Sequence, residues 1–286
     1  MSLPQPNDAF VWTQADGLPV LVCRPLAEIA PHFFTTRGWP PGQAGAGDEA
    51  WARVAESAGV PPSYLVRARQ VHGTLVVAAS EPGTEMTDGD VIVTKNPALA
   101  LAVQSADCVP ILIADRGTGA VAAVHAGWRG LSVRVPGATV AAMTREFGSQ
   151  RKDLVAAIGP SIGACCYEVG RDVLDRFIKT GFTGDQIERW FARAPAADPR
   201  NPPMPSLPKE ARADHWYFDG WASAREQLRM VGIPEGQIFA AELCTASHPE
   251  SLCSYRRDGS PAGRLAAVIR VHGAGRQAGP TRPYRS

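Results

Sequence analysis

The chain has 286 residues, of which 45% are hydrophobic and 20% charged, and its 29 basic and 28 acidic residues leave a formal net charge of +1. A chain of this length can bury a substantial core, either as one large α/β unit or as two domains. Because the charges nearly cancel, the composition argues against binding to a nucleic-acid backbone or to an anionic membrane surface. Small-molecule chemistry is therefore the starting hypothesis.

No segment is typical of a membrane helix or a secretory leader. The longest apolar run near the middle, Ala98–Val103, is far shorter than the roughly 18 residues that a membrane helix needs. The first residues contain no basic cluster followed by an apolar stretch, which a signal peptide requires. Six cysteines, with Cys165 and Cys166 adjacent, are too sparse for a disulfide scaffold. We expect a cytoplasmic protein with reduced thiols.

Short apolar runs predict the strands, and several are apolar at every position, as in strands that are buried on both faces. They are Leu75–Ala79, Asp90–Thr94, Leu99–Val103, Val109–Ala114, Ala120–Val124, Leu154–Ile158 and Leu265–Val271. Helical spacing before a glycine or over an amphipathic run predicts the helices. They lie around Val140, Met143 and Phe147, and over Val173–Ile178, Ile187–Ala192 and Trp221–Met230.

The order of these elements favours an α/β (α+β) layered sandwich with mixed central sheets. We expect residues 1–286 to form a single domain. Six prolines fall within Ala194–Pro208, and this density predicts an irregular surface loop.

Residues 105–125 have the pattern of strand, tight turn and strand, which is typical of a β-hairpin. If Arg116 and Gly117 form a two-residue turn, Cys108 lies opposite His125. Directly opposed residues have Cβ atoms about 4.5–5.5 Å apart, from which a thiolate and an imidazole can share one tetrahedral ion. A longer loop would shift this register by a residue or two. Considered singly, each residue is more simply explained as part of the core, so the metal hypothesis depends on the pairing.

The residues after His125 include Gly127, Arg129 and Gly130, and the chain then has helical spacing toward Phe147. A glycine turn that leads into a helix presents free backbone N–H groups and a positive dipole end, which favour an anion. Arg129 would add a bidentate donor for a phosphate. The alternative is that the glycines only form the turn and that Arg129 is solvated.

Seven short motifs and a final Gly-Arg pair occur in order over Thr35–Val271. They are RQVHG at 69–73, SADCVP at 105–110, VHAGWRG at 124–130, AIGPSIG at 157–163 with CYEVG at 166–170, ELCT at 242–245, and SYRRDG at 254–259 with GR at 263–264. Together they resemble the YfiH family, also called the multicopper polyphenol oxidoreductase or laccase-domain family.

The resemblance implies a zinc site formed by His72, Cys108 and His125, which would also be the catalytic residues. Three protein ligands with an open fourth position are typical of catalytic zinc. It also implies a fold related to cytotoxic necrotizing factor-type hydrolases, with purine nucleosides and phosphate as partners. The implied activities are phosphorolysis of adenosine, inosine and methylthioadenosine, and adenosine deamination. Copper binding in vitro is possible, since copper outcompetes zinc in most nitrogen and sulfur sites.

The same hypothesis assigns substrate-binding roles to five arginines that would balance the phosphate charge. They are Arg37, Arg129, Arg256, Arg257 and Arg264. Two segments depart from the family pattern: Gly38-Trp39-Pro40-Pro41 follows Arg37, and Phe218-Asp219-Gly220 leaves Asp219 without a role. Asp107, beside Cys108, is considered as a general acid. The other cysteines and histidines are expected to be structural or surface residues, with Cys244 and Cys253 weighed as a second site: Cys165, Cys166, Cys244, Cys253, His32, His215, His248 and His272.

Other functions remain open at this stage. Some relatives resemble a peptidoglycan-precursor editing hydrolase, and an older family name assigns polyphenol oxidation, although five methionines and six dispersed histidines are few for several copper sites. A metal-free hydrolase would use Cys108 as nucleophile and His125 as base. A non-catalytic binding module would close the metal site with a fourth protein ligand. We expect a monomer or a weak homodimer.

Overall fold

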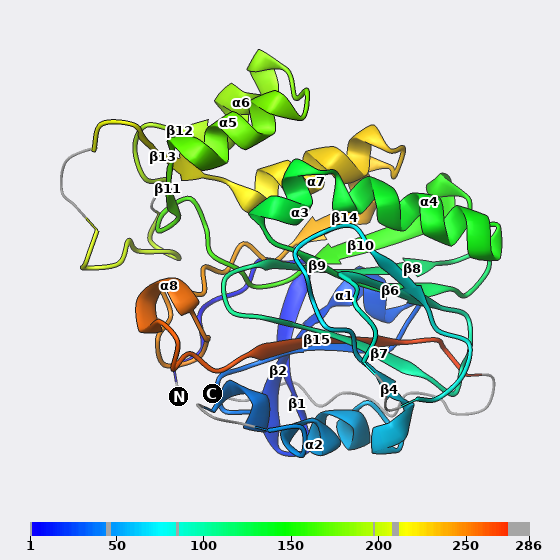
Figure 1. Cartoon of the computed structure of the whole chain (residues 1–286). Coiled ribbons are helices and arrows are strands. Elements are labelled where there is room, and N and C mark those ends of the chain that lie inside the picture. Colours follow the sequence, from blue (N-terminus) through cyan, green and yellow to red (C-terminus); the bar gives the residue numbers. More distant parts are fainter. Residues whose placement is uncertain (1, 44–46, 84–85, 197, 208–211, 274–286) are drawn as a thin grey trace.

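Two six-stranded mixed sheets lie face to face in the computed structural model, which describes residues 2–43, 47–83, 86–196, 198–207 and 212–273 (Figure 1). The first sheet has the order β1 (Phe10–Ala15), β2 (Leu18–Cys23), β3 (His32–Thr35), β15 (Leu265–Arg270), β7 (Ala100–Ser105) and β4 (Leu65–Val66). The second has the order β14 (Ile238–Ala240), β10 (Leu154–Ile158), β8 (Val109–Asp115), β9 (Val121–Ala126), β6 (Val91–Thr94) and β5 (Val76–Ala78). A small third sheet contains β11 (Glu168–Gly170), β13 (His215–Phe218) and β12 (Phe191–Ala192).

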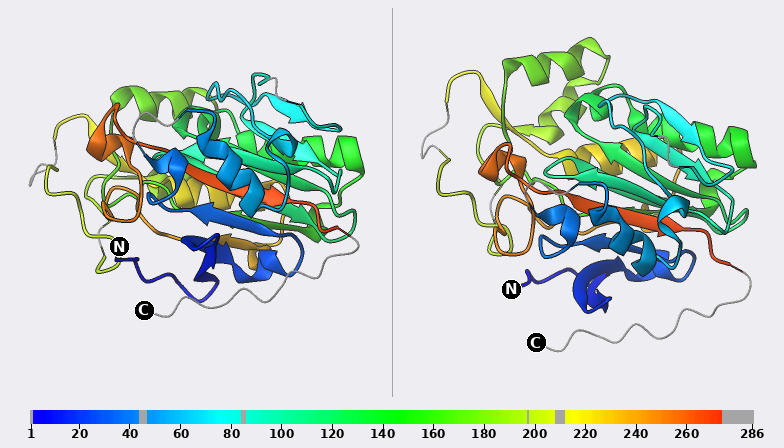
Figure 2. Two further views of the ribbon diagram at one scale, coloured as in Figure 1. Left: turned by 90° about the horizontal axis from the view of Figure 1, so that it is seen from below. Right: turned by 60° about the horizontal axis from the view of Figure 1, so that its bottom comes forward.

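Helices cover the outer face of each large sheet. Figure 2 shows α2 (Ala50–Ser57) crossing β15 on the outside of the first sheet. The second sheet is covered by α3 (Trp128–Ser132), α4 (Val135–Phe147) and α7 (Gly220–Met230) (Figure 1). The remaining helices are α1 (Arg24–Ala27), α5 (Arg171–Lys179), α6 (Gly184–Trp190) and α8 (Tyr255–Asp258), with 3-10 turns η1 (Pro40–Gly42), η2 (Pro62–Tyr64), η3 (Arg151–Asp153) and η4 (Glu235–Gln237). Within the described ranges, no helix combines the length and the hydropathy of a bilayer span.

Each large sheet separates two hydrophobic cores. In β6, Val91 and Val93 pack into the core beneath the helices, whereas Ile92 packs into the core between the sheets. Alternate side chains of a strand point to opposite faces, so a strand covered on both faces is apolar throughout. The prediction of a layered mixed α/β sandwich with doubly buried strands is therefore confirmed.

All seven predicted strands exist, as β5 to β10 and β15. The strands that sequence analysis missed are β1 to β4 and β11 to β14, most of which have two to four residues, too few to show a period. The predicted helix Ile187–Ala192 is wrong at its end: Thr183 and Gln186 form a capping box that starts α6, and residues 191–192 form β12. Of the Pro-rich segment, residues 197 and 208 lie outside the described residues, and Asn201 and Met204 are buried.

The predicted hairpin is β8 and β9, but the N–H of Asp115 donates to the carbonyl of Ala120, so the loop has four residues, 116–119, instead of two. The carboxylate of Asp115 accepts the N–H groups of Gly117 and Thr118, which stabilises the longer loop. Pro110, and not Cys108, therefore lies opposite His125. A register shift of two residues keeps side chains on the same face, so Cys108 and His125 still point to one side.

The segment after β9 also differs from its prediction. Instead of one helix toward Phe147, it forms two, α3 and α4, separated by Arg134 in a left-handed conformation with φ of 62°. Pro136 lies in the first turn of α4, where proline is tolerated because its missing N–H would have no partner in a continuing helix. Asp219, which had no role in the sequence analysis, caps α7 by accepting the N–H of Ala222 at 2.8 Å.

Because His32 is buried, we expect the free energy of unfolding to fall at acidic pH. Its Nε2 accepts the N–H of Cys23 at 3.0 Å, its Nδ1 donates to the carbonyl of Ala30, and burial lowers its pKa to about 4. The contribution of His32 to the free energy of unfolding is fully present above pH 6.5. It is lost as the pH falls toward 4, because the histidine of the unfolded chain then binds a proton more readily than the buried one. We expect this group to contribute about 2 kcal/mol of destabilisation between pH 7.5 and 5. Urea unfolding at both pH values should show a pH dependence smaller by that amount in His32→Gln, and an unchanged dependence would contradict this assignment.

Candidate metal centre and active site

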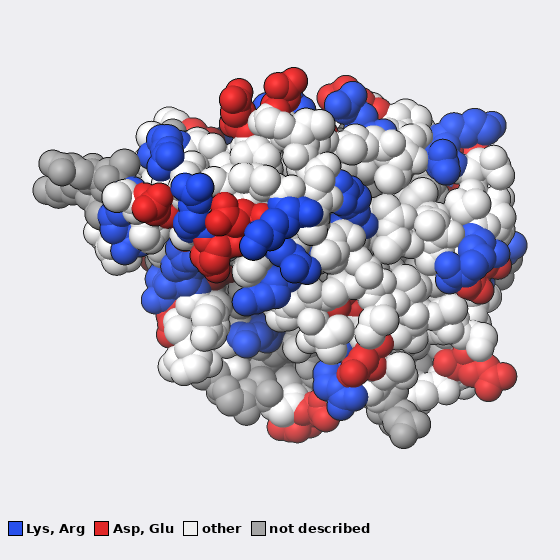
Figure 3. Space-filling view, turned by 45° about the horizontal axis from the view of Figure 1, so that its top comes forward, with Lys and Arg blue, Asp and Glu red and all other residues white. Residues whose placement is uncertain are grey.

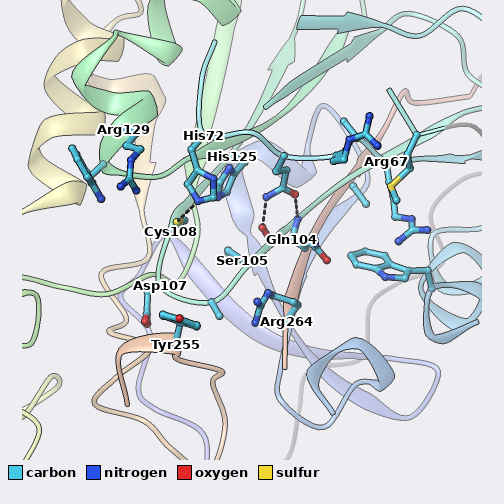
Figure 4. Close-up of a pocket in the computed structure, with 18 of the residues that line it drawn as sticks. Arg67, His72, Gln104, Ser105, Asp107, Cys108, His125, Arg129, Tyr255 and Arg264 are labelled. Carbon is cyan, nitrogen blue, oxygen red and sulfur yellow. Dashed lines mark hydrogen bonds between the residues drawn. The ribbon is translucent and has the colours of Figure 1, made fainter. Parts of the chain in front are cut away.

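His72, Cys108 and His125 meet at one end of the sandwich, where the chain crosses between the two sheets (Figure 4). His72 lies on the connection from β4 to β5 and Cys108 on the connection from β7 to β8, while His125 belongs to β9. Their ligand atoms all lie within 4.8 Å of one another, and Cys108 Sγ is 4.0 Å from His72 Nε2. The structure thus brings together all three residues that were predicted to be metal ligands.

Asp90 orients both histidines, and sequence analysis did not single it out. This fully buried carboxylate accepts the N–H groups of His72 at 2.9 Å and Gly73 at 2.6 Å, and it accepts Nδ1–H of His125 at 2.8 Å. Because Nδ1 of His125 is occupied, Nε2 is the nitrogen left for a ligand. The available signal was an acidic residue at the start of an apolar strand, since a buried carboxylate needs partners.

The loop that carries His72 is fastened to the first sheet. The amide of Gln70 donates to the carbonyl of Gln104 and accepts its N–H, both at 2.8 Å (Figure 4). His72 itself has a left-handed φ of 61°, a conformation that costs a non-glycine residue about 1–3 kcal/mol and that persists where surrounding contacts hold it. The position of its imidazole is therefore set by Gln70 and Asp90 together.

The charges of the three side chains support one another. Burial alone would raise the pKa of the Cys108 thiol, but hydrogen bonds and charge from His125 and His72 more than offset it and lower that pKa to about 6. Burial alone would lower the pKa of His125, but Asp90 and Cys108 raise it to about 9. The site therefore favours a thiolate, which is the form of cysteine that binds metals.

The three donors fit a tetrahedral metal ion with nitrogen and sulfur ligands. A Cβ atom at Gly127 would lie 3.0 Å from Cys108 Sγ and 3.1 Å from Cδ2 of His72, so glycine at this position leaves the space beside the donors open. In the part of the chain that the structure describes, no fourth histidine, cysteine or carboxylate joins the group. This open set differs from the closed site that a purely structural metal would need.

The three residues line a pocket of about 780 Å³, a size typical of small-molecule sites. Aromatic side chains form part of its wall: Trp51, Trp128, Tyr167 and Tyr255. Its arginines are Arg67, Arg69, Arg129, Arg256 and Arg264. Arg67 pairs with Asp48 and Arg69 with Asp88. Counting described residues only, Arg129, Arg256 and Arg264 form no ion pair with a carboxylate, and their charge is therefore available to a ligand.

The structure separates the five arginines that were predicted to bind substrate. Arg129, Arg256 and Arg264 line the pocket, whereas Arg37 and Arg257 do not. Arg37 pairs with Asp258 at 3.1 Å, and Arg257 is bound to Asp258 and to the carbonyls of three residues, Thr245, Ala246 and Leu252. Their guanidinium groups thus hold the segment around α8 in place.

Asp107 also lines the pocket, but its carboxylate is engaged. One oxygen accepts the hydroxyl of Thr245 and the other the N–H of Arg256, both at 2.6 Å. Arg256 in turn donates to the carbonyl of Glu168 and lies over the ring of Tyr167. Asp107 thereby positions Arg256 at the pocket wall.

The surface charge is mixed. On the face in Figure 3, the basic and acidic side chains of the described residues lie interspersed and are separated by wide uncharged areas. This distribution agrees with the formal net charge of +1. The positive charge that is relevant to a ligand is that of the pocket arginines.

Comparisons with known proteins identify the family of this chain. A family model described as multi-copper polyphenol oxidoreductase laccase matches residues 43–272. A protein named purine nucleoside phosphorylase from Bacteroides thetaiotaomicron is 36% identical over 220 residues, which are 74% of each chain. One of the same name from Deinococcus radiodurans is 33% identical over 272 residues, covering 89% of this chain and 94% of that one. The Escherichia coli protein named purine nucleoside phosphorylase YfiH is 33% identical over 213 residues, 74% and 76% of the two chains.

Solved structures show the same fold. YfiH from Bacillus licheniformis superposes with a TM-score of 0.78 at 24% identity, covering 93% of this chain and all of that one. YlmD from Geobacillus stearothermophilus superposes with a TM-score of 0.74 at 26% identity, covering 91% and 99%. The family match, the identities and the shared fold agree with the motifs from which the resemblance was predicted. The chain belongs to the multi-copper polyphenol oxidoreductase laccase family, which includes the YfiH proteins.

Proposed function

We propose that this chain is a zinc-dependent purine nucleoside phosphorylase that acts on adenosine, inosine and methylthioadenosine and also deaminates adenosine. The observation that carries the proposal is a His-Cys-His donor set in a pocket with three arginines that have no carboxylate partner among the described residues. The names of the relatives point to the same reaction. The proposal includes residues 1–286 acting as one domain, as a monomer or weak homodimer, in the cytoplasm, where six free cysteines would stay reduced.

The pocket offers groups for both substrates. The exposed ring of Tyr255 in the pocket lining can stack on a purine, since aromatic rings pair in offset or edge arrangements. Arg129, Arg256 and Arg264 can hold phosphate through charge-assisted hydrogen bonds. In phosphorolysis a phosphate oxygen forms a bond to the anomeric carbon while the bond from that carbon to the base breaks, giving the free base and ribose 1-phosphate.

His72, Cys108 and His125 would hold the metal ion, which when bound supplies a Lewis acid at the pocket floor. The chain's own contribution is orientation and charge. Asp90 fixes the ring of His125 and the loop of His72, and the arginines neutralise the phosphate so that it can approach the nucleoside.

A product-resolved assay tests this function. Each of the three nucleosides is incubated with and without phosphate, and the products are identified by mass spectrometry. We expect free base only when phosphate is present, together with ribose 1-phosphate from adenosine and inosine and 5-methylthioribose 1-phosphate from methylthioadenosine; inosine formed from adenosine is the sign of deamination. Free ribose without phosphate, or no release of base from any of the three, would contradict phosphorolysis.

Substituting Arg129 should separate phosphate binding from nucleoside binding. We expect Arg129→Ala to raise the KM for phosphate about 10- to 100-fold, because a hydrogen bond to a charged group is worth about 1.5–3 kcal/mol. The KM for inosine should change little. Arg116→Ala is the matched control, since this arginine bonds to Gln237 at the far end of β8. Equal changes in both KM values would show that Arg129 shapes the turn without binding phosphate.

A further inference from the structure

Three cysteines outside the pocket converge in the core. Cys165 and Cys166 lie between β10 and β11, and Cys244 follows β14. Their side chains are 0–1% exposed, and all three are free thiols. The three sulfur atoms lie within 4.8 Å of one another. Sequence analysis treated them as packing residues and weighed Cys253 as the partner of Cys244, but Cys253 contacts the carbonyl of Gly42 instead.

The spacing of the sulfurs suits a bound ion. With metal–sulfur bonds of about 2.3 Å, tetrahedral geometry places sulfur ligands about 3.8 Å apart, so small side-chain movements would close the observed set around one ion. Cys244 Sγ accepts the N–H of Gly163 at 3.3 Å. Burial would raise the pKa of Cys244, but hydrogen bonds from Cys165 and Cys166 hold it well below its ordinary value.

A nearby histidine gives a second, independent observation. His248 lies four residues after Cys244, and its Nε2 is buried with no hydrogen-bond partner among the described residues. Its other side bonds to the backbone of Arg200, and burial lowers its pKa although the charge of Cys244 acts in the opposite direction. A buried nitrogen without a partner costs about 1–3 kcal/mol, and a metal would satisfy it. His248 does not belong to the 4.8 Å group, so its side chain would have to move to become a fourth ligand.

We propose that Cys165, Cys166 and Cys244 form a second metal site, separate from the His-Cys-His centre, that binds a thiophilic d10 cation, Zn²⁺ or Cu⁺. Thiolate ligands select these ions over harder ones. Each thiol that binds releases its proton to solvent, and no oxidation is involved. The site is structural, since it lies in a hydrophobic cluster with Ile162, Met204 and Ala246.

The segment 198–207 packs against this site. Asn201 accepts the N–H of Cys244 at 2.8 Å and donates to the carbonyl of Glu242. The carbonyl of Pro202 accepts the Ser247 hydroxyl at 2.6 Å, and that hydroxyl lies 3.5 Å from Cys166 Sγ. An ion on the three sulfurs would therefore hold the Pro-rich segment against the sheet. Binding of the ion should then raise the stability of the protein, which can be measured independently of metal stoichiometry.

Metal stoichiometry in the full-length chain tests the site. The protein is stripped with a chelator under reducing, anaerobic conditions, loaded with Zn²⁺ or Cu⁺ in separate samples, and measured by elemental analysis. We expect two equivalents in the wild type, one in Cys108→Ala, one in Cys166→Ala/Cys244→Ala, and none in the triple variant. Cys23→Ala, a buried cysteine in the core between the sheets, should keep two.

Thermal unfolding tests the same site without activity. In the Cys108→Ala background, the ion should raise Tm by about 5–10 °C when present at about 100 times its Kd, and adding Cys166→Ala/Cys244→Ala to that background should remove the increase. If His248→Ala binds one equivalent of Zn²⁺ but still two of Cu⁺, His248 is the fourth ligand of a zinc site. If it still binds two equivalents of either metal, the second site consists of the three thiolates. One equivalent in the wild type, unchanged by Cys166→Ala/Cys244→Ala, would overturn the proposal. So would a disulfide among these cysteines that forms in place of metal binding.

Discussion

Cys108→Ala should lose the bound metal of the pocket and at least about 1000-fold in phosphorolysis. The substitution removes the only sulfur of the His72, Cys108 and His125 set and the thiolate that helps to raise the pKa of His125 to about 9. Loss of Lewis-acid stabilisation costs several kcal/mol, and each 1.36 kcal/mol is about tenfold in rate. The measurements are elemental analysis of the purified variant and kcat/KM for inosine with phosphate.

A matched control and a chelator experiment decide how Cys108 acts. Cys23→Ala also removes a buried thiol, but one in the core between the sheets, and it should retain metal and turnover. Chelation should reduce the wild type to the level of Cys108→Ala, and Zn²⁺ should restore it. A stripped enzyme that keeps its turnover and is inactivated stoichiometrically by a thiol reagent would show instead that Cys108 is a nucleophile.

Sequence analysis was most successful for contacts between segments that are adjacent in the chain. The strands Val109–Ala114 and Ala120–Val124 are adjacent in the chain, so the proximity of Cys108 and His125 could be predicted even with the register wrong by two residues. The error came from Asp115, whose side chain stabilises a four-residue loop where a two-residue turn was expected. His72 comes from a connection between the two sheets, and only the family resemblance pointed to it.

Long-range contacts explain what was missed. Asp90 reaches His72 and His125 from the start of β6, and no local spacing encodes that approach. Cys165 and Cys244 meet because β10 and β14 pair in parallel and the chain continues from Ser161 beside Cys244. The charge of Arg37 and Arg257 suggested phosphate binding, but Asp258 engages both.

Asp90→Asn should lower metal affinity about 10- to 100-fold, the usual effect of removing the hydrogen-bonded partner of a ligating histidine. The amide has one acceptor oxygen in place of two, whereas Asp90 accepts the N–H groups of His72 and Gly73 and Nδ1–H of His125. An NH₂ group would face at least one of these donors, so the ring of His125 or the loop of His72 would turn. Competition with a chromogenic chelator measures the affinity.

Asp115→Asn is the control that separates the positioning of the metal ligands from the stability of the fold. Asp115 is also buried and also accepts backbone N–H groups, those of Gly117 and Thr118, but it lies at the opposite end of β8 from the metal site. In both variants the free energy of unfolding, measured with urea, should fall by about 1–3 kcal/mol, the cost of a buried donor left unpaired. Only Asp90→Asn should also lower the metal affinity, since Asp90 orients the ligating residues His72 and His125 and Asp115 contacts neither. Equal metal affinity in the two variants would mean that Asp90 supports the fold alone, and that His72 and His125 are positioned by the backbone.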